Sequence, residues 1–505
     1  MLSKVKSFGL SGLEGFMVTV EVDVSASLPA CEIVGLPDAA VRESKERVRS
    51  AIKNSGFDYP VGRITVNLAP ADMKKEGSVY DLPIALGIIS ATGQLKGPMP
   101  DYIYLGELAL DGSIRGIHGL LPMVISASAQ GYDTFVVPSA NAPETSYISS
   151  VTAYGAASLR EAVDIINSKG RAVPWEKKQW SPKRISYHND FEDIKGQYGA
   201  KRAAEIAAAG GHNMLLVGTG KTMLAKSMPS ILPELTFNEA LEITKIQSIT
   251  GIMEAGEGIA SERPFRSPHH SASTAALVGG GQKAMPGEIS LAHYGVLFLD
   301  EFPEFSKDVL ESLRQPLEDG VVTITRASAK ATYPADFMLI AAMNPCPCGY
   351  YGSRVQECRC KPYEIAKYRN RISGPLLDRL DMHVEMAEVG HSDITSNKPG
   401  ESSAAIRERV DEARRIQRER YKKDGIICNA QLSARLVKKY CVPDENGQRL
   451  MRQAYERLNL SARAYNRVMK VARTIADLSG GGDITYEHIA EAIQYRTVDK
   501  KYWGE

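Results

Sequence analysis

Three short apolar segments constrain the fold of this chain more than any other feature. They read NMLLVG (213–218), GVLFLD (295–300) and FMLIAAMN (337–344), and helix-forming sequence separates them. Continuous apolar runs of this length are typical of strands that are buried on both faces of a parallel sheet. We therefore predict an α/β core, a parallel sheet with helices on both faces, between about 190 and 395.

Polar residues come at the end of each segment. Lys221 and Thr222 follow the first strand, Asp300 and Glu301 the second, and Asn344 the third. Because the carboxyl ends of parallel strands meet at one edge of a sheet, these groups should lie together. A lysine and a threonine after a glycine loop suit phosphate and Mg²⁺, an aspartate can hold Mg²⁺, and a glutamate can polarise an attacking water. The sequence predicts a site for ATP and Mg²⁺.

Length and composition bound the rest of the chain. Its 505 residues suggest roughly two to four domains. The formal net charge is +1, so a DNA-binding face would have to be local. No run approaches the ~20 apolar residues of a membrane span, and the N-terminal sequence lacks the apolar core of a signal peptide. We expect a cytoplasmic protein with no membrane association.

The predicted layout has four parts. They are an N-terminal α+β domain at 1–168, a linker at 169–190, the α/β core at 191–395 and a C-terminal helical domain at 396–505. In the first part, Asp111-Gly112 is a strong hairpin signal. In the last part, Ile406, Val410 and Ala413 fall on one face of a predicted helix.

Several strings resemble one family. They include GHNMLLVG, RPFRSPHHSAS, GEISLAHYGVLFLDEFPEF, LRQPLEDG, AAMNPCPCGYYG and YRNRISGPLLDRLDMHVE. They look like the magnesium-chelatase-like AAA+ ATPases of the YifB/ComM type, over essentially the whole chain. The resemblance implies an AAA+ core with a C-terminal helical lid and an ATP-driven homo-oligomeric ring, expected to be a hexamer. ComM-like members are DNA helicases that drive branch migration in recombination and natural transformation.

The resemblance also implies roles for single residues. Lys221 and Thr222 match the phosphate and Mg²⁺ positions, Asp300 and Glu301 the Walker B pair, Asn344 sensor 1, Arg379 the arginine finger and Arg463 sensor 2. A finger supplied by a neighbouring subunit places a cation on the γ-phosphate and requires a head-to-tail ring. The alternative for Arg379 is a surface ion pair with a nearby aspartate. The alternative for sensor 2 is Arg467, one helical turn further along.

The phosphate loop departs from the family pattern. The motif G-x-x-x-x-G-K-[ST] requires a glycine where this chain has Leu215. The family usually reads VGPPGTGKT, whereas only Gly218, Thr219 and Gly220 precede Lys221 here. Fewer backbone N–H groups are then available to wrap the β-phosphate, although the helix N-terminus retains some anion affinity. A local deletion, a natural variant with weak ATPase activity and a compensated loop all fit this sequence.

Two insertions and a cysteine group stand out within the core. In the related helix-insert clade, hairpins such as GVVTITRASAKATYPADF point into the ring channel, so Arg326 and Lys330 are candidate contacts to branched or single-stranded DNA. Hairpin tips are also often basic simply because they are wet. In the other insertion, we expect His269 and His270 to be hydrated loop residues.

Four cysteines form two Cys-x-Cys knuckles: Cys346, Cys348, Cys358 and Cys360. Four thiolates can close a tetrahedral structural Zn²⁺ site, although these knuckles are tighter than the usual spacing. The other three cysteines are expected to be packed thiols. They are Cys31, Cys428 and Cys441.

The N-terminal part resembles the proteolytic domain of Lon, whose serine nucleophile is activated by a lysine. Val79 and Leu121 stand at these two positions, and neither can act as nucleophile or base. Ser78 is adjacent but has no evident lysine partner. We therefore predict a Lon-like domain without peptidase activity. Two functional alternatives to a DNA motor remain: a motor subunit for metal insertion, as in magnesium chelatase, and a scaffold with little ATPase activity.

Overall fold

The structure is a computed structural model of the whole chain. It describes residues 1–168, 170–182, 189–253, 258–325, 330–353, 356–388, 390, 400–458 and 460–503. These residues form two compact units. The first comprises Met1–Ser181, Phe237–Ser261 and Lys330–Thr332, and the second comprises Pro182–Thr236, Glu262–Ala329 and Tyr333–Glu505. The domain boundaries predicted at 168, 190 and 395 stay predictions. None of the described helices combines the length and the apolar character that a membrane span requires.

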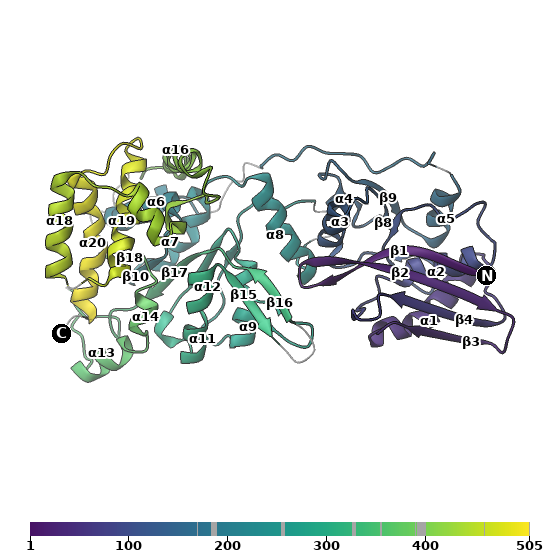
Figure 1. Cartoon of the computed structure of the whole chain (residues 1–505). Coiled ribbons are helices and arrows are strands. Elements are labelled where there is room, and N and C mark those ends of the chain that lie inside the picture. The colour runs from purple at the N-terminus through teal and green to yellow at the C-terminus, as the bar shows by residue number, and fades with distance from the viewer. Residues whose placement is uncertain are drawn as a thin grey trace. The chain divides into compact units, whose positions relative to one another are not determined.

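A seven-stranded mixed sheet forms the centre of the first unit (Figure 1). Its strands, in spatial order, are β3 (Ala30–Val34), β4 (Arg63–Ala69), β2 (Glu14–Ser25), β1 (Leu2–Ser11), β5 (Ile103–Tyr104), β8 (Thr134–Pro138) and β9 (Thr152–Ala156). The strands β1, β2 and β4 pair antiparallel, and the other pairs are parallel. Alternate residues of β4 are buried, namely Ile64, Val66 and Leu68. This period of two is that of a strand with one face on the core.

Helices complete the first unit. They are α1 (Ala39–Asn54), α2 (Asp81–Ala91), α3 (Leu120–Ala129), α4 (Ala142–Thr145), α5 (Leu159–Asn167) and α8 (Phe237–Thr250). Helix α1 begins after Asp38, whose carboxylate accepts a 2.8 Å hydrogen bond from the Val41 N–H. The predicted turn at Asp111-Gly112 is confirmed, since it joins the antiparallel strands β6 (Glu107–Leu108) and β7 (Ile114–Arg115).

The second unit is built on the predicted parallel sheet. Its five strands, in spatial order, are β11 (Phe265–Arg266), β14 (Val296–Leu299), β17 (Met338–Met343), β10 (Met214–Gly218) and β18 (Met382–Met386). All four neighbouring pairs are parallel. Every residue of β14 and β17 is buried, so both faces of the sheet are covered. The predicted fold class of this core, a parallel α/β sheet with helices on both faces, is therefore confirmed.

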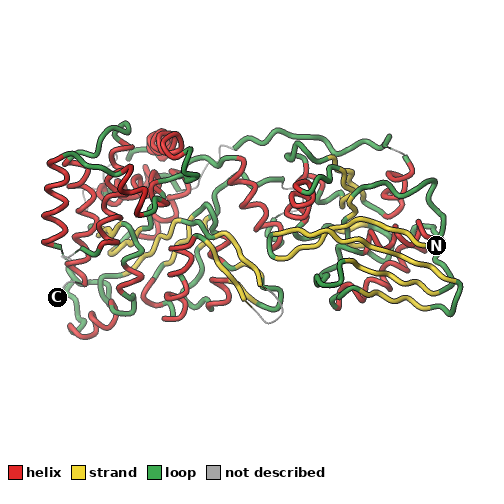
Figure 2. Tube along the Cα trace, viewed as in Figure 1, coloured by secondary structure: helices red, strands yellow, loops and turns green. Residues whose placement is uncertain are grey.

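Helices cover this sheet and make up the C-terminal part of the chain (Figure 2). The principal ones are α6 (Tyr198–Gly210), α7 (Lys221–Ser227), α11 (Lys307–Ser312), α12 (Arg314–Asp319), α13 (Pro362–Arg369), α16 (Ser403–Tyr421), α17 (Ala434–Tyr440), α18 (Glu445–Arg457), α19 (Ala462–Leu478) and α20 (Tyr486–Trp503). The insertions contribute α9 (Thr274–Val278), α10 (Glu288–Leu291), β12 (Gly279–Gly280), β13 (Met285–Pro286), β15 (Val321–Thr325) and β16 (Lys330–Pro334). Ile406, Val410 and Ala413 of α16 are all buried, as their spacing predicts.

The sheet of the second unit has two polar edges. At the carboxyl edge the ends of β10, β17 and β14 align, because Val217 pairs with Met343 and Leu299 pairs with Ala341. At the amino edge the Asp381 N–H donates to the Asn213 carbonyl at 2.9 Å, just before β18 and β10 begin. A strand rises ~3.3 Å per residue, so β10 separates the two edges by roughly 13 Å.

Candidate functional site

The loop between β10 and α7 lies at the carboxyl edge. Gly218 and Gly220 both adopt positive φ, +128° and +82°, which favours glycine. A Cβ on Gly218 would lie 2.6 Å from the Met386 carbonyl oxygen, so the loop passes close to β18. Lys221 is only 9% exposed, and its ammonium donates to the Gly218 carbonyl and, at 2.8 Å, to Oδ1 of Asn344. Burial lowers the pKa of Lys221. The ammonium therefore joins the loop to the end of β17.

A hydroxyl and a carboxylate meet beside this lysine. Thr222 Oγ1 donates to Asp300 Oδ2 at 2.9 Å, and the Glu301 N–H donates to Asp300 Oδ1 at the same distance. Oxygen ligands of this kind suit Mg²⁺, and a hydroxyl paired with a carboxylate is the arrangement expected of its site next to a phosphate. The residues present therefore fit the cation that the sequence predicts.

Glu301 adopts a left-handed backbone conformation, with φ +51°. Its side chain is 56% exposed, and its Oε2 lies 2.8 Å from Nδ1 of His270. The His269 ring lies 4.1 Å from the His270 ring, and Phe305 contacts His270 edge-on. The expectation that both histidines are simply hydrated is therefore wrong for His270. The signal that could have found it was the string RPFRSPHHSAS, which itself carries part of the family resemblance.

Arg379 and Arg463 lie at the other edge of the sheet. Arg379 comes two residues before Asp381 and donates to the Pro375 carbonyl at 2.7 Å and to the Glu318 carboxylate. Arg463 Nη2 lies 3.7 Å from the same carboxylate. The structure thus brings Lys221, Thr222, Asp300, Glu301 and Asn344 together, and it places the two arginines with each other at the opposite edge.

Arg463 and its neighbour Arg467 differ in their surroundings. The Arg467 side chain is 17% exposed, and its Nε lies 2.9 Å from Asp381 Oδ1. The Arg463 side chain is 59% exposed. Arg467 is therefore held by an internal ion pair, whereas Arg463 is the one that solvent and a ligand can reach.

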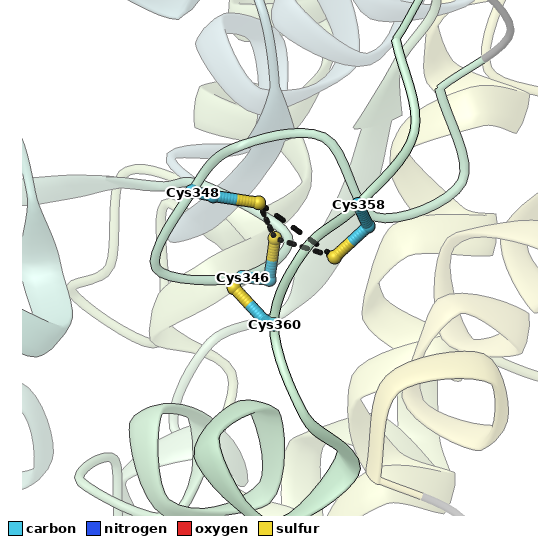
Figure 3. A group of neighbouring side chains, drawn as sticks. All are labelled: Cys346, Cys348, Cys358 and Cys360. Carbon is cyan, nitrogen blue, oxygen red and sulfur yellow. Dashed lines mark hydrogen bonds between the residues drawn. The ribbon is translucent and has the colours of Figure 1, made fainter.

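The four cysteines converge after β17. Figure 3 shows their sulfur atoms facing one another, and all four Sγ atoms lie within 4.8 Å of each other. Cys346 is 3.3 Å from Cys348 and 3.6 Å from Cys358, and Cys348 is 3.6 Å from Cys358. Four sulfur atoms held at ~2.3 Å by a tetrahedral Zn²⁺ stand about 3.8 Å apart. The short Cys-x-Cys spacing is thus compatible with this geometry.

The thiol chemistry of this cluster suits a metal as well. The Tyr350 and Arg359 backbone N–H groups donate to Cys348 and lower the pKa of its thiol, whereas burial and the neighbouring sulfur atoms raise the pKa of Cys358 and Cys360. A thiolate is the form that binds a metal. Cys346 is fully buried and comes two residues after Asn344. The cluster can therefore hold a metal ion directly beyond the end of β17.

Comparison with known proteins gives the family. Three family models match: subunit ChlI of Mg-chelatase at 20–141, magnesium chelatase subunit ChlI at 190–394, and the C-terminal part of that subunit at 400–496. The competence protein ComM of Haemophilus influenzae is 44% identical, covering 98% of this chain and 98% of ComM. YifB of Salmonella typhimurium is 43% identical, covering 97% of this chain and 96% of YifB. This chain belongs to the magnesium-chelatase-like ComM/YifB family.

Similarity to magnesium chelatase itself is more restricted. The 67 kDa magnesium-chelatase subunit of Chlorobaculum tepidum is 30% identical over 163 residues, which are 31% of this chain and 23% of that subunit. The ComM/YifB relatives, in contrast, match from end to end. The chain is thus an AAA+ protein of the ComM/YifB type.

The first unit of this ComM/YifB protein carries apolar residues at the two Lon-like positions. Val79 is 8% exposed and Leu121 is fully buried. Ser78 donates its hydroxyl to Glu107, and the buried Lys75 donates to the carbonyls of Pro70 and Met73. Ser78 and Lys75 are therefore each hydrogen-bonded to other residues and not to one another.

Two further predictions concern the hairpin and the remaining thiols. Lys330 lies at the start of β16 and is exposed, whereas Arg326 lies outside the described residues. Cys428 and Cys441 are buried, as predicted, and burial raises the pKa of both thiols. Cys31 is half-buried against the core of the first unit.

Proposed function

We propose that this ComM/YifB protein is an ATP-dependent ring motor that acts on DNA. One observation carries the proposal: the groups suited to nucleotide and Mg²⁺ lie at the carboxyl edge of the sheet, and Arg379 and Arg463 lie at the amino edge. A single chain cannot bring both sets to one phosphate. Two copies packed head to tail can, and repetition of that contact closes a ring.

Each residue at the carboxyl edge then has a chemical role. Lys221 binds the β- and γ-phosphates, and Thr222 and Asp300 hold Mg²⁺, which supplies charge neutralisation when it is bound. Glu301 orients and polarises the attacking water, and Asn344 holds the end of β17 against Lys221. His270 contacts Glu301 and would fix the direction of its carboxylate.

The residues at the amino edge act on the neighbouring copy. Arg379 is the finger that stabilises the charge developing on the γ-phosphate, which can contribute ~10³–10⁵ in rate. Arg463 Nη2 lies 3.7 Å from the Glu318 carboxylate, which also binds Arg379. Both arginines can therefore contact the γ-phosphate bound to the neighbouring copy. A hexamer is the ring we propose, by analogy with AAA+ motors.

We propose that the ring moves along DNA and that the protein acts in the cytoplasm. The support is the similarity to a protein named for competence, together with the exposed Lys330, which begins β16 at the turn end of the β15–β16 hairpin. We propose branch migration in recombination or natural transformation as the reaction, with branched or single-stranded DNA in the ring. Zn²⁺ is the proposed occupant of the cysteine cluster, where it would be structural because all four positions are filled by protein.

The shortened phosphate loop decides whether this chain is an active motor. The test is ATP turnover with and without branched DNA, measured on the chain as it stands and on a variant with Pro-Pro-Gly inserted after Gly218. We expect DNA-stimulated turnover in the restored variant at least. An ATP turnover rate that is the same with and without DNA would favour a metal-insertion motor. A folded restored variant without any turnover would favour a scaffold, and would contradict the proposal.

A further inference from the structure

The amino edge of the second unit contains a cationic cavity, which we call the arginine pocket. Its volume is about 320 Å³, and its charged lining residues are Glu318, Arg379, Arg463, Arg467 and Lys470. Asp381, which does not line the cavity, pairs with Arg467 at 2.9 Å, so Glu318 is the one carboxylate among the lining residues and faces the remaining cations, Arg379, Arg463 and Lys470. Such a surplus of positive charge favours an anionic ligand.

Glu318 is shared by two of these cations. Arg379 donates through Nη2 to one carboxylate oxygen, and Arg463 Nη2 lies 3.7 Å from the other oxygen. The hydrogen bond from Arg379 lowers the pKa of Glu318, so the carboxylate is ionised at neutral pH. The Arg379 side chain is 8% exposed, whereas that of Glu318 is 52% exposed. A half-exposed carboxylate thus covers a buried guanidinium.

The pocket also has donors without acceptors. Arg379 Nε and Arg467 Nη1 are buried and have no hydrogen-bond partner in the part of the chain that the structure describes. Burial penalises the charged forms of Arg467 and Lys470 and lowers the pKa of both. Buried polar groups in folded proteins normally have partners. A ligand with more oxygen atoms and more negative charge than one carboxylate would supply them.

We propose that Glu318 is a placeholder for phosphate. Its carboxylate holds Arg379 and Arg463 until the terminal phosphate of a nucleotide, bound to a second copy of this chain, displaces it. This inference rests on the proposed function, in which both arginines serve the neighbouring copy. A terminal phosphate offers three oxygens where the carboxylate offers two, and it carries more charge. It therefore binds the two arginines more strongly than Glu318 does once the neighbouring copy brings it into contact with them. Glu318 therefore opposes premature closure of the ring.

The first test uses inorganic phosphate on the full chain. Glu318→Gln keeps the shape of the side chain and removes the competing charge, so phosphate should bind about two- to fivefold more tightly, the range that part-exposed ion pairs give. Asp319→Asn removes a charge from the next residue of α12, which does not line the pocket, and should change nothing. The gain should vanish in the Glu318→Gln, Arg379→Ala double variant. Equal phosphate affinity of Glu318→Gln and the unmodified chain overturns the inference.

The second test uses turnover and separates this role from simple support of the finger. With the restored phosphate loop, Glu318→Gln should lower two quantities by about the same two- to fivefold factor: the KM for ATP and the protein concentration that gives half-maximal turnover. The kcat should be maintained. If Glu318 only orients Arg379, kcat should fall instead, and the inference is wrong. Failure of the proposed function looks different. Turnover is then absent in every variant, and the phosphate measurement alone decides the role of Glu318.

Discussion

The two edges of the parallel sheet in the second unit carry opposite kinds of chemistry. The carboxyl edge combines a lysine with Asp300 and Glu301, and its groups are already bonded to each other. The amino edge combines four cations with Glu318 and Asp381, and among the described residues its buried Arg379 Nε and Arg467 Nη1 have no hydrogen-bond partner. The polar groups at the carboxyl edge thus find most of their hydrogen-bond partners within a single chain, whereas those at the amino edge do not. This asymmetry suggests that the amino edge is completed by another copy.

A second contrast concerns two altered motifs. In the first unit, Val79 and Leu121 stand at the positions that the sequence predicts to match the Lon nucleophile and base, and both are packed into the protein. At the phosphate loop, the length has changed but the neighbouring polar groups retain their hydrogen bonds. Retention of a hydrogen-bonded set therefore points to a local change in the loop rather than to general loss of the site.

The largest expected effect tests whether the two edges work in different copies. With the phosphate loop restored, Arg379→Ala should reduce ATP hydrolysis by ~10³-fold or more while leaving nucleotide binding intact, because the finger acts on the transition state. Mixing this variant with Glu301→Gln should restore part of the turnover, since a mixed interface pairs an intact finger with an intact Walker B glutamate. Steady-state ATPase assays measure both. Arg415→Ala, on the exposed face of α16, is the matched control. Mixed rings that form and stay inactive would contradict action between copies.

The next effect concerns the carboxyl edge alone. Inserting Pro-Pro-Gly after Gly218 should tighten ATP binding by roughly a hundredfold, because each charge-assisted hydrogen bond to phosphate contributes ~1.5–3 kcal/mol and two or three are regained. Calorimetric titration with ATP measures the change. The same insertion after Gly480, an exposed turn residue with open space where a Cβ would lie, is the control. If the chain as it stands already binds ATP at micromolar concentrations and the insertion adds nothing, the loop is compensated.

A smaller effect is expected from the metal cluster, which adjoins the carboxyl edge through Asn344. Purified without chelators, the protein should contain roughly one zinc per chain, and Cys358→Ser should lose it. Turnover should fall without being abolished, because the Pro345 carbonyl stays bonded to Arg369 at 3.1 and 3.0 Å. Elemental analysis measures the metal, and Cys441→Ser serves as the control. Well-folded protein without zinc would contradict the assignment.

The sequence was sufficient for the elements and the linear motifs, because these depend on local patterns. The buried strands, the turn at Asp111-Gly112 and the grouping of four cysteines were all predictable from spacing. The pairing of Arg379 with Glu318 was not, since the two are 61 residues apart and meet only through tertiary packing. One signal was available, however. Arg379 comes before an apolar strand rather than after one, which already places it at the amino edge.

The smallest expected effect belongs to neither edge. Lys330 lies on β16 and is exposed, so Lys330→Ala should weaken DNA binding only a few-fold at physiological salt and leave DNA-independent ATP hydrolysis unchanged. If it contacts one phosphate, the slope of log affinity against log salt concentration should become shallower by ~0.7–0.9. Titrations of labelled single-stranded and branched DNA across a salt series measure this slope. The control is Lys423→Ala, which removes another exposed lysine two residues after the end of α16. An unchanged slope for Lys330→Ala would mean that the lysine is exposed only because hairpins are solvated, and the DNA path would then have to be sought on another surface.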